Sequence, residues 1–169
     1  MQNTIFSEIR EASHIVQSDI SKFLLRNIII VDDDAINLEV ARRALTPQYK
    51  VRMYKSGIQL LEALKNFIPD LIFLDVVMPD MDGYETIVHL KRNKKTKHIP
   101  VIFLSSNDDS VSEQKAMELG AFDYLHKPYS SHMLRRYLRL AQCLKIQANE
   151  IDMYNRNCVC KRKGICYVT

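Results

Sequence analysis

Polar side chains that can do chemistry follow several short apolar runs of this sequence, within two residues of the end of each run. They are carboxylates, a hydroxyl and an amine: Asp32 and Asp33 with Asp34 beside them, Asp75, Ser105 and Lys127. If the runs are parallel strands, their carboxyl ends meet at one edge of a sheet. These side chains would then share one small site.

Such a group predicts phosphoryl chemistry on a carboxylate. Clustered carboxylates repel one another and resist ionising together. Mg²⁺ resolves the conflict, because it prefers oxygen ligands and tolerates several waters. One carboxylate can then attack phosphorus as a nucleophile. In the acyl phosphate that results, the metal, the hydroxyl and the ammonium each have an oxygen to bind, and phosphoryl transfer needs little more from a protein.

The elements that must position these residues alternate between strand and helix patterns. The expected strands are short, rich in β-branched residues and bounded by polar or turn residues: Asn27–Val31, Lys50–Tyr54, Asp70–Leu74, Pro100–Leu104 and Phe122–Leu125. The intervening segments predict helices at about 35–46, 57–67, 83–93 and 110–119. This alternation predicts an α/β, doubly wound parallel sheet with helices on both faces.

Two extensions flank this core. Apolar residues recur at helical spacing between Ile5 and Phe23, which predicts an amphipathic N-terminal helix within residues 1–26. A last helix begins near Ser130 and meets no breaker until about Asn155. Its two apolar heptad series are compatible with a dimerising helix, and equally with a final helix that packs on the sheet.

Composition and charge exclude several classes of protein. The chain has 169 residues, of which 47% are hydrophobic and 26% charged, as in a globular protein of one domain with extensions. No apolar run approaches the ~18 residues of a membrane-spanning helix, and no secretory signal begins the chain. We therefore expect a cytoplasmic protein with reduced cysteines and no membrane partner. The basic residues of 130–169 lack a DNA-reading motif, so nucleic acid is not an expected partner.

Four segments, in order, resemble the receiver domain of two-component response regulators: IIIVDDDAIN, DLIFLDVVMPDMDGYE, IPVIFLSS and GAFDYLHKP. The resemblance covers about residues 27–149, leaving 1–26 as an extension and 150–169 as a basic tail. It implies a flavodoxin-like five-stranded sheet in the order 2-1-3-4-5. The stretch from Met81 to Ser106 is most similar to receivers that precede diguanylate cyclase domains.

The resemblance also implies a role for each site residue. Asp75 matches the phosphoacceptor, and Asp32 and Asp33 match the acidic pair that holds Mg²⁺ together with Asp75 and the backbone carbonyl of Val77. Ser105 matches the switch hydroxyl. Two further positions complete the pattern: Lys127, whose bond to Pro128 is expected to be cis, and Tyr124, the aromatic switch residue.

The neighbouring residues have plainer interpretations. Asp34 is expected to cap the helix that follows it. Asp80 and Asp82 are expected to shape the loop before Gly83, with Gly83 in a conformation that a Cβ atom would penalise. In the family, the positions of Val77 and Asn107 flank the route of the attacking water. Their apolar and uncharged side chains predict a dephosphorylation rate different from that of fast-cycling relatives.

The predicted function is a signalling switch rather than an enzyme beyond its own phosphorylation and dephosphorylation. A histidine kinase or phosphotransfer protein would phosphorylate Asp75. The face formed by helix 110–119, strand 122–125 and the last helix would then change, and could pair with a second copy. Because the sequence after Pro128 has no room for an output domain, we expect a stand-alone receiver or a truncated regulator of the diguanylate cyclase type.

Two other functions remain open at this point. A haloacid-dehalogenase-like phosphatase also uses Asp, Ser or Thr, and Lys at strand ends, but it places the nucleophile on the first strand and leaves the motif around Asp75 unexplained. A receiver fold that no longer accepts phosphate would be a pure interaction module, although Ser105 and Lys127 are retained. Cys158, Cys160 and Cys166, with Cys143 upstream, match a zinc site only in part, so a reduced tail is expected.

Overall fold

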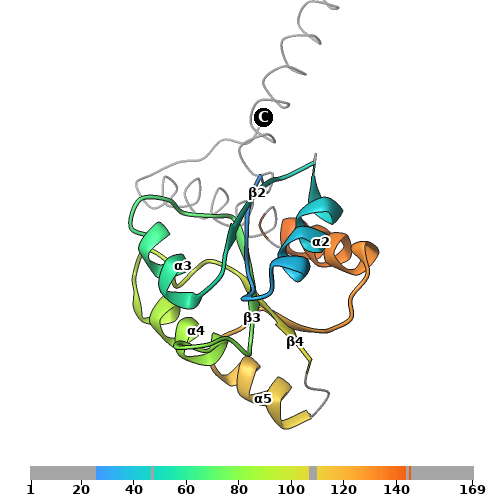
Figure 1. Cartoon of the computed structure of the whole chain (residues 1–169). Coiled ribbons are helices and arrows are strands. Elements are labelled where there is room, and N and C mark those ends of the chain that lie inside the picture. Colours follow the sequence, from blue (N-terminus) through green and yellow to red (C-terminus); the bar gives the residue numbers. More distant parts are fainter. Residues whose placement is uncertain (1–25, 47, 107–109, 144, 146–169) are drawn as a thin grey trace, which may run out of the picture. The chain divides into compact units, whose positions relative to one another are not determined.

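The five apolar runs form the five strands of one parallel sheet in the computed structural model of the chain (Figure 1). The structure describes residues 26–46, 48–106, 110–143 and 145. The strands are β1 (Asn27–Val31), β2 (Lys50–Tyr54), β3 (Leu71–Asp75), β4 (Val101–Ser105) and β5 (Asp123–His126). Their order is β2-β1-β3-β4-β5, and every pairing is parallel. The doubly wound fold and its strand order are therefore confirmed.

Helices cover both faces of the sheet. They are α2 (Ala35–Leu45), α3 (Gly57–Ala63), α4 (Gly83–Arg92), α5 (Ser110–Glu118) and the helical residues 131–143. Figure 1 shows α3, α4 and α5 on one face, and α2 with the start of the last helix on the other. Leu25–Arg139 form one compact unit, which is described here by itself.

The central strands of the sheet are anchored by complete burial. Every residue of β3 and β4 is buried, as expected for central strands covered on both faces. Phe73 and Phe103 are the largest of the fully buried side chains. Burying a side chain of this size contributes about 1.5–3 kcal/mol. The edge strand β2 is half-buried to exposed, so the best-anchored strand ends are those of the sheet's centre.

Three helices begin with a side chain that accepts a backbone N–H of the first turn. Asp34 accepts from Ile36 at 2.7 Å, which confirms its predicted role as the cap of α2. Ser56 caps α3 and Asp82 caps α4 in the same way. These caps satisfy donors that the helix itself leaves unpaired, and they fix where each loop from the sheet ends.

Some predicted element ends were wrong by a few residues. The predicted strands β3, β4 and β5 begin and end one residue too early, because they were ended at the last apolar residue. Backbone pairing continues through the polar residues Asp75 and Ser105. Helix α3 ends at Ala63 rather than near 67, because residues 65 and 66 bond three residues back instead of four.

Several predictions fall outside the described residues. They include the amphipathic helix of 1–26 (apart from Arg26), the last helix beyond 145, and the tail with Cys158, Cys160 and Cys166. The boundaries 1–26, 27–149 and 150–169 stay predictions. Within the described residues, no helix combines the length and apolar character needed to cross a membrane.

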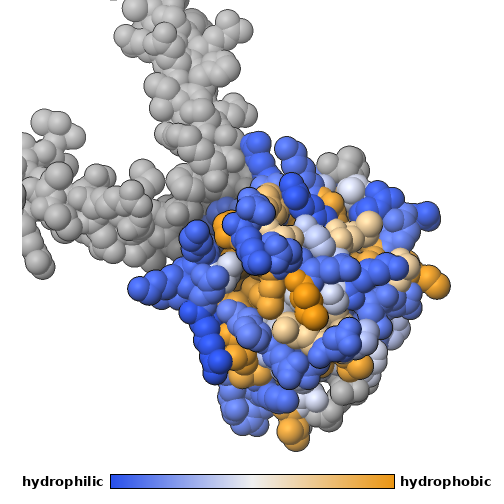
Figure 2. Space-filling model, turned by 60° about the vertical axis from the view of Figure 1, so that its left-hand side comes forward, coloured by the Kyte–Doolittle hydropathy of each residue, from blue (hydrophilic) through white to orange (hydrophobic). Residues whose placement is uncertain are grey.

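The surface carries apolar side chains in small groups. Figure 2 shows one face of the molecule, on which hydrophobic residues are interspersed with more numerous hydrophilic ones. Exposed apolar side chains include Ile36 and Val40 on α2, and Val111 and Met117 on α5. Such scattered exposure is ordinary for a globular domain and by itself assigns no partner.

Candidate functional site

The strand register brings the predicted acidic residues together. Val31 of β1 lies opposite Leu74 of β3, so the next residues along the two strands, Asp32 and Asp75, are neighbours. Both are buried, Asp32 completely and Asp75 with 4% of its surface exposed. The sheet therefore holds two carboxylates side by side at its carboxyl edge, as the sequence predicted.

Lys127 connects these two carboxylates. Its Nζ lies 2.7 Å from Oδ2 of Asp32 and 2.9 Å from Oδ2 of Asp75. The backbone N–H of Lys127 donates to the carbonyl oxygen of Ser105 at 2.6 Å, which ties the loop after β5 to the end of β4. The Lys127-Pro128 peptide bond is cis, as predicted. One ammonium thus faces two buried carboxylates.

Asp33 adds a third carboxylate to this group. Oxygen atoms of Asp32, Asp33 and Asp75 all lie within 4.8 Å of one another, and Asp33 is exposed where the other two are buried. A set of carboxylate oxygens that opens to solvent on one side fits a small, hard divalent cation that keeps some of its waters. Three carboxylates against one ammonium also leave net negative charge, so the donor set fits Mg²⁺.

The surroundings of Asp75 and Lys127 shift their pKa values for different reasons. Burial raises the pKa of Asp75, and the charge of Asp32 raises it further, against the lowering effect of Lys127. Burial alone would lower the pKa of Lys127, but its hydrogen bonds to Asp32 and Asp75 outweigh burial and raise that pKa. Lys127 therefore stays charged. Any further positive charge at the site would favour the ionised form of Asp75.

The loop that follows β3 holds Val77, a further predicted site residue. The N–H of Val77 lies 3.4 Å from Oδ1 of Asp75, and the Val77 side chain is exposed. The role of the Val77 carbonyl oxygen as a metal ligand stays a prediction. Asn107, the other residue expected beside the attacking water, lies outside the described residues.

The prediction for Gly83 was right about the penalty and wrong about its cause. Its φ is not positive; the left-handed residue of this loop is Asp80, with φ of 67°. A Cβ atom on Gly83 would instead lie 2.3 Å from the carbonyl oxygen of Asp75 and 2.9 Å from Cα of Val76. Helix α4 thus begins in direct contact with the backbone of Asp75.

The two predicted switch residues lie on neighbouring strands, where Ser105 pairs with His126 and Tyr124 pairs with Phe103. Ser105 is fully buried at the end of β4, and Tyr124 on β5 is buried in the core. The Tyr124 ring packs edge-on against Phe103, with centroids 6.3 Å apart, and against His126, at 5.1 Å. The ring therefore lies inward, between β4 and the end of β5.

Two residues near the site were not singled out from the sequence. The side-chain amide of Asn37 donates to Oδ1 of Asp32 at 3.1 Å. Burial raises the pKa of the Tyr129 phenol, and the charges of Asp32 and Asp75 raise it further. The only available signal for Asn37 was its polar side chain in the first turn after the three aspartates; Tyr129 gave none beyond its place after Pro128.

An α/β domain with an acidic pocket, a buried hydroxyl and a lysine at the carboxyl edge of its sheet has the architecture of a phosphoacceptor domain. Residues 28–139 match the model of the response regulator receiver domain family. The chain belongs to this family. The family predicted from the sequence is therefore confirmed, and the haloacid-dehalogenase alternative is set aside.

Two curated relatives match this chain over only part of their own length. A probable cyclic di-GMP phosphodiesterase of Vibrio cholerae is 41% identical over 122 residues, which cover 72% of this chain and 27% of the relative. The response regulator PleD of Caulobacter vibrioides is 34% identical over 125 residues, covering 73% and 28%. The chain thus spans about a quarter of the length of these two relatives.

Among solved structures, the receiver domain of the sensor histidine kinase PA1611 from Pseudomonas aeruginosa is similar in fold. The two chains superpose with a TM-score of 0.65 and 26% identity, over 69% of this chain and 97% of that one. That domain has a magnesium ion coordinated in its active site cleft.

Proposed function

We propose that this receiver domain is a phosphorylation switch in which Asp75 accepts the phosphoryl group. The observation that carries the proposal is the pair of contacts from Lys127 to Asp32 and Asp75 at 2.7 and 2.9 Å. A lysine fixed in this way neutralises part of the charge that a phosphoryl group would bring. It leaves the exposed side of the pocket, beside Asp33, for the incoming donor.

Asp32, Asp33, Asp75 and the Val77 carbonyl are the proposed ligands of Mg²⁺. The bound ion supplies positive charge that offsets the carboxylates and the transferred phosphoryl oxygens. Burial makes Asp75 costly to ionise, so this added charge keeps it in the anionic, nucleophilic form.

The transfer itself exchanges one bond to phosphorus for another. A carboxylate oxygen of Asp75 forms the new P–O bond while the P–N bond to the donor histidine breaks, and the histidine ring nitrogen keeps the bonding electrons. Lys127 would then face the carboxylate of Asp32 and an anionic phosphoryl oxygen, because the acylated carboxyl group of Asp75 no longer carries its own charge. Ser105, at the adjacent strand end, offers a hydroxyl to the same group, and Tyr124 follows its movement.

The partners of the switch follow from this chemistry. A histidine kinase or phosphotransfer protein donates the phosphoryl group, in the cytoplasm. The responding face is formed by α5, β5 and the helical residues 131–139. On α5, Val111 and Met117 are exposed and available to a second copy. The name of the Vibrio cholerae relative supports a target in cyclic di-GMP signalling.

The test is phosphorylation with a small-molecule donor and Mg²⁺, read out by intact mass and by size-exclusion chromatography. We expect one phosphoryl group on the wild-type chain, none on Asp75→Asn, and a shift toward dimer only when the group is present. Asp82→Asn is the matched control, since asparagine caps a helix about as well as aspartate and Asp82 is not one of the clustered carboxylates. Phosphorylation of Asp75→Asn at the wild-type level would refute the assignment.

A further inference from the structure

We propose that Asn37 is a positioning residue for the metal site, acting through the carboxylate of Asp32. The inference rests on the proposed function of the acidic pocket. Oδ1 of Asp32 accepts the side-chain amide of Asn37 at 3.1 Å and the backbone N–H of Asp34 at 3.0 Å. Oδ2 accepts Lys127 at 2.7 Å. Asn37 therefore donates to the oxygen of Asp32 that does not contact Lys127.

The orientation of Asp32 needs such a support because the residue is completely buried. The terminal torsion of an aspartate has a broad energy minimum, so packing and hydrogen bonds decide where the two oxygens point. A carboxylate can only accept hydrogen bonds, so it is the NH₂ group of Asn37 that faces it. Loss of this donor would leave Oδ1 with the single backbone N–H of Asp34.

A comparison with α3 indicates that Asn37 is not needed to begin its own helix. Asn37 and Gln59 each occupy the third position of a helix that follows a strand. Gln59 serves its helix locally: its N–H donates to the Ser56 hydroxyl, and its Oε1 accepts the N–H of Lys55 at 3.0 Å. In α2 the capping bond runs from Ile36 to Asp34, and the Asn37 amide turns back to the strand end instead.

The chemical type of the donor also fits a metal site. An amide holds a carboxylate by hydrogen bonding without neutralising its charge. A lysine or arginine at this position would orient Asp32 equally well, but it would add a second cation beside Lys127 and compete with Mg²⁺. A neutral donor keeps the pocket both ordered and negatively charged.

The experiment compares Asn37→Leu with Gln59→Leu, which removes an amide from the equivalent position of α3. Mg²⁺ binding is measured by calorimetry, and phosphorylation by acetyl phosphate is followed across a range of Mg²⁺ concentrations. For Asn37→Leu we expect Mg²⁺ affinity to fall by roughly three- to tenfold, the usual range for one hydrogen bond. The half-saturating Mg²⁺ concentration should rise equally, and the phosphorylation rate at saturating Mg²⁺ should stay near wild type.

Gln59→Leu should lose stability without any change in Mg²⁺ affinity. Asn37→His restores a donor at nearly the same distance from the backbone, so at about pH 8, where a histidine is neutral, it should recover most of the affinity. Asn37→Ser, whose hydroxyl is too short to reach Asp32, replaces the leucine variant if that variant does not fold.

Unchanged Mg²⁺ affinity in a folded Asn37→Leu protein would overturn the proposal, as would a lower saturated rate with unchanged half-saturation. Failure of the proposed function would look different. The wild-type chain itself would then not be phosphorylated, whereas the calorimetric comparison of Asn37 variants could still be made.

Discussion

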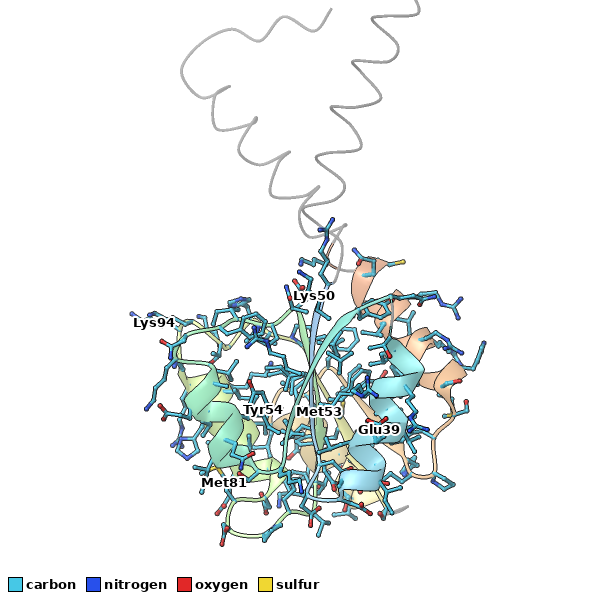
Figure 3. The ribbon with its side chains drawn as sticks, turned by 45° about the horizontal axis from the view of Figure 1, so that its top comes forward. Glu39, Lys50, Met53, Tyr54, Met81 and Lys94 are labelled. Atoms are coloured by element: carbon cyan, nitrogen blue, oxygen red, sulfur yellow. The ribbon has the colours of Figure 1, made fainter. Side chains whose placement is uncertain are left out.

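At the amino edge of the sheet, half-buried charged side chains hydrogen-bond to backbone groups, whereas at the carboxyl edge buried charged side chains also contact one another. Asp70, before β3, accepts the backbone N–H groups of Arg26 and Asn27 at 2.9 and 3.0 Å. Half-buried Lys91, at the end of α4, donates to the carbonyl oxygens of Lys97 and Ile99. Figure 3 shows the two ends, with Lys50 and Lys94 at the amino edge and Met81 at the other.

At the carboxyl edge, backbone N–H groups also donate to Asp32 and Asp75, but there the charged side chains contact one another as well. Asp32 and Asp75 share one ammonium, that of Lys127, and Asp33 adds a third carboxylate beside them. Backbone hydrogen bonds stabilise a charged side chain and leave no binding site for an ion. Three carboxylates around one ammonium leave net negative charge, which can bind a cation. The difference indicates that charge left uncompensated by its neighbours marks the edge where the phosphoryl site is proposed.

Replacing the lysine at each edge should give the largest difference in the free energy of unfolding. Lys127→Met leaves two buried carboxylates without their shared partner, so we expect a loss of about 3 kcal/mol in the free energy of unfolding in metal-free buffer. Lys91→Met loses hydrogen bonds to two neutral carbonyls and should cost about 1–2 kcal/mol. Urea denaturation measures both.

Mg²⁺ provides the control for this comparison. Added Mg²⁺ should recover part of the stability lost in Lys127→Met, because a cation replaces some of the missing positive charge. It should leave the loss in Lys91→Met unchanged. An equal response of the two variants to Mg²⁺ would contradict the distinction between the edges.

Two glycines give a second contrast, of intermediate size. Gly83→Ala would drive a methyl group against the carbonyl oxygen of Asp75 at 2.3 Å, and we expect a cost of about 2–3 kcal/mol. Gly120, at the amino edge, has φ of 87° and only the flexible Lys91 side chain nearby, at 3.6 Å. Gly120→Ala should cost about 1 kcal/mol, from backbone strain alone.

The phosphorylation rate separates these two glycine variants further. Gly83→Ala should displace the backbone of Asp75, the proposed phosphoacceptor, so phosphorylation by acetyl phosphate should slow markedly even under conditions where the protein is fully folded. Gly120→Ala should be phosphorylated at the wild-type rate. A folded Gly83→Ala protein with unchanged kinetics would indicate that the start of α4 does not position Asp75.

The sequence predicted most of this arrangement because strand identity and strand ends are local signals. Short apolar runs placed β1 and β2 at their observed bounds, and parallel packing then brought Asp32, Asp75 and Lys127 to one edge. The roles of Asp33, Ser105 and Tyr124 depended on the family resemblance, since residue type alone does not assign them.

The missed features depend on three-dimensional contacts that carry no periodic signal. Asn37 and Gln59 look alike in sequence, and only the fold decides that one faces Asp32 and the other its own helix. Gly83 was correctly marked as a constrained glycine, but the constraint is a contact with a different strand end, which a local conformational preference cannot reveal.

The smallest expected effect concerns pH. Burial raises the pKa of Asp75 above its ordinary value of 3.8, so the native state keeps this proton at pH values where the unfolded chain has already lost it. As pH rises through that window, the native state binds more protons than the unfolded chain, and this residue lowers the free energy of unfolding. Asp75→Asn removes the effect.

The measurement is the free energy of unfolding from about pH 4 to about pH 8 in metal-free buffer, for wild type and Asp75→Asn. The wild type should lose stability relative to the variant as pH rises through this window. Saturating Mg²⁺ should reverse the sign near neutral pH, since binding stabilises only the chain with its full set of carboxylates. Lys91→Met should keep the wild-type slope, because Lys91 lies at the amino edge of the sheet, at the opposite end of the strands from Asp75.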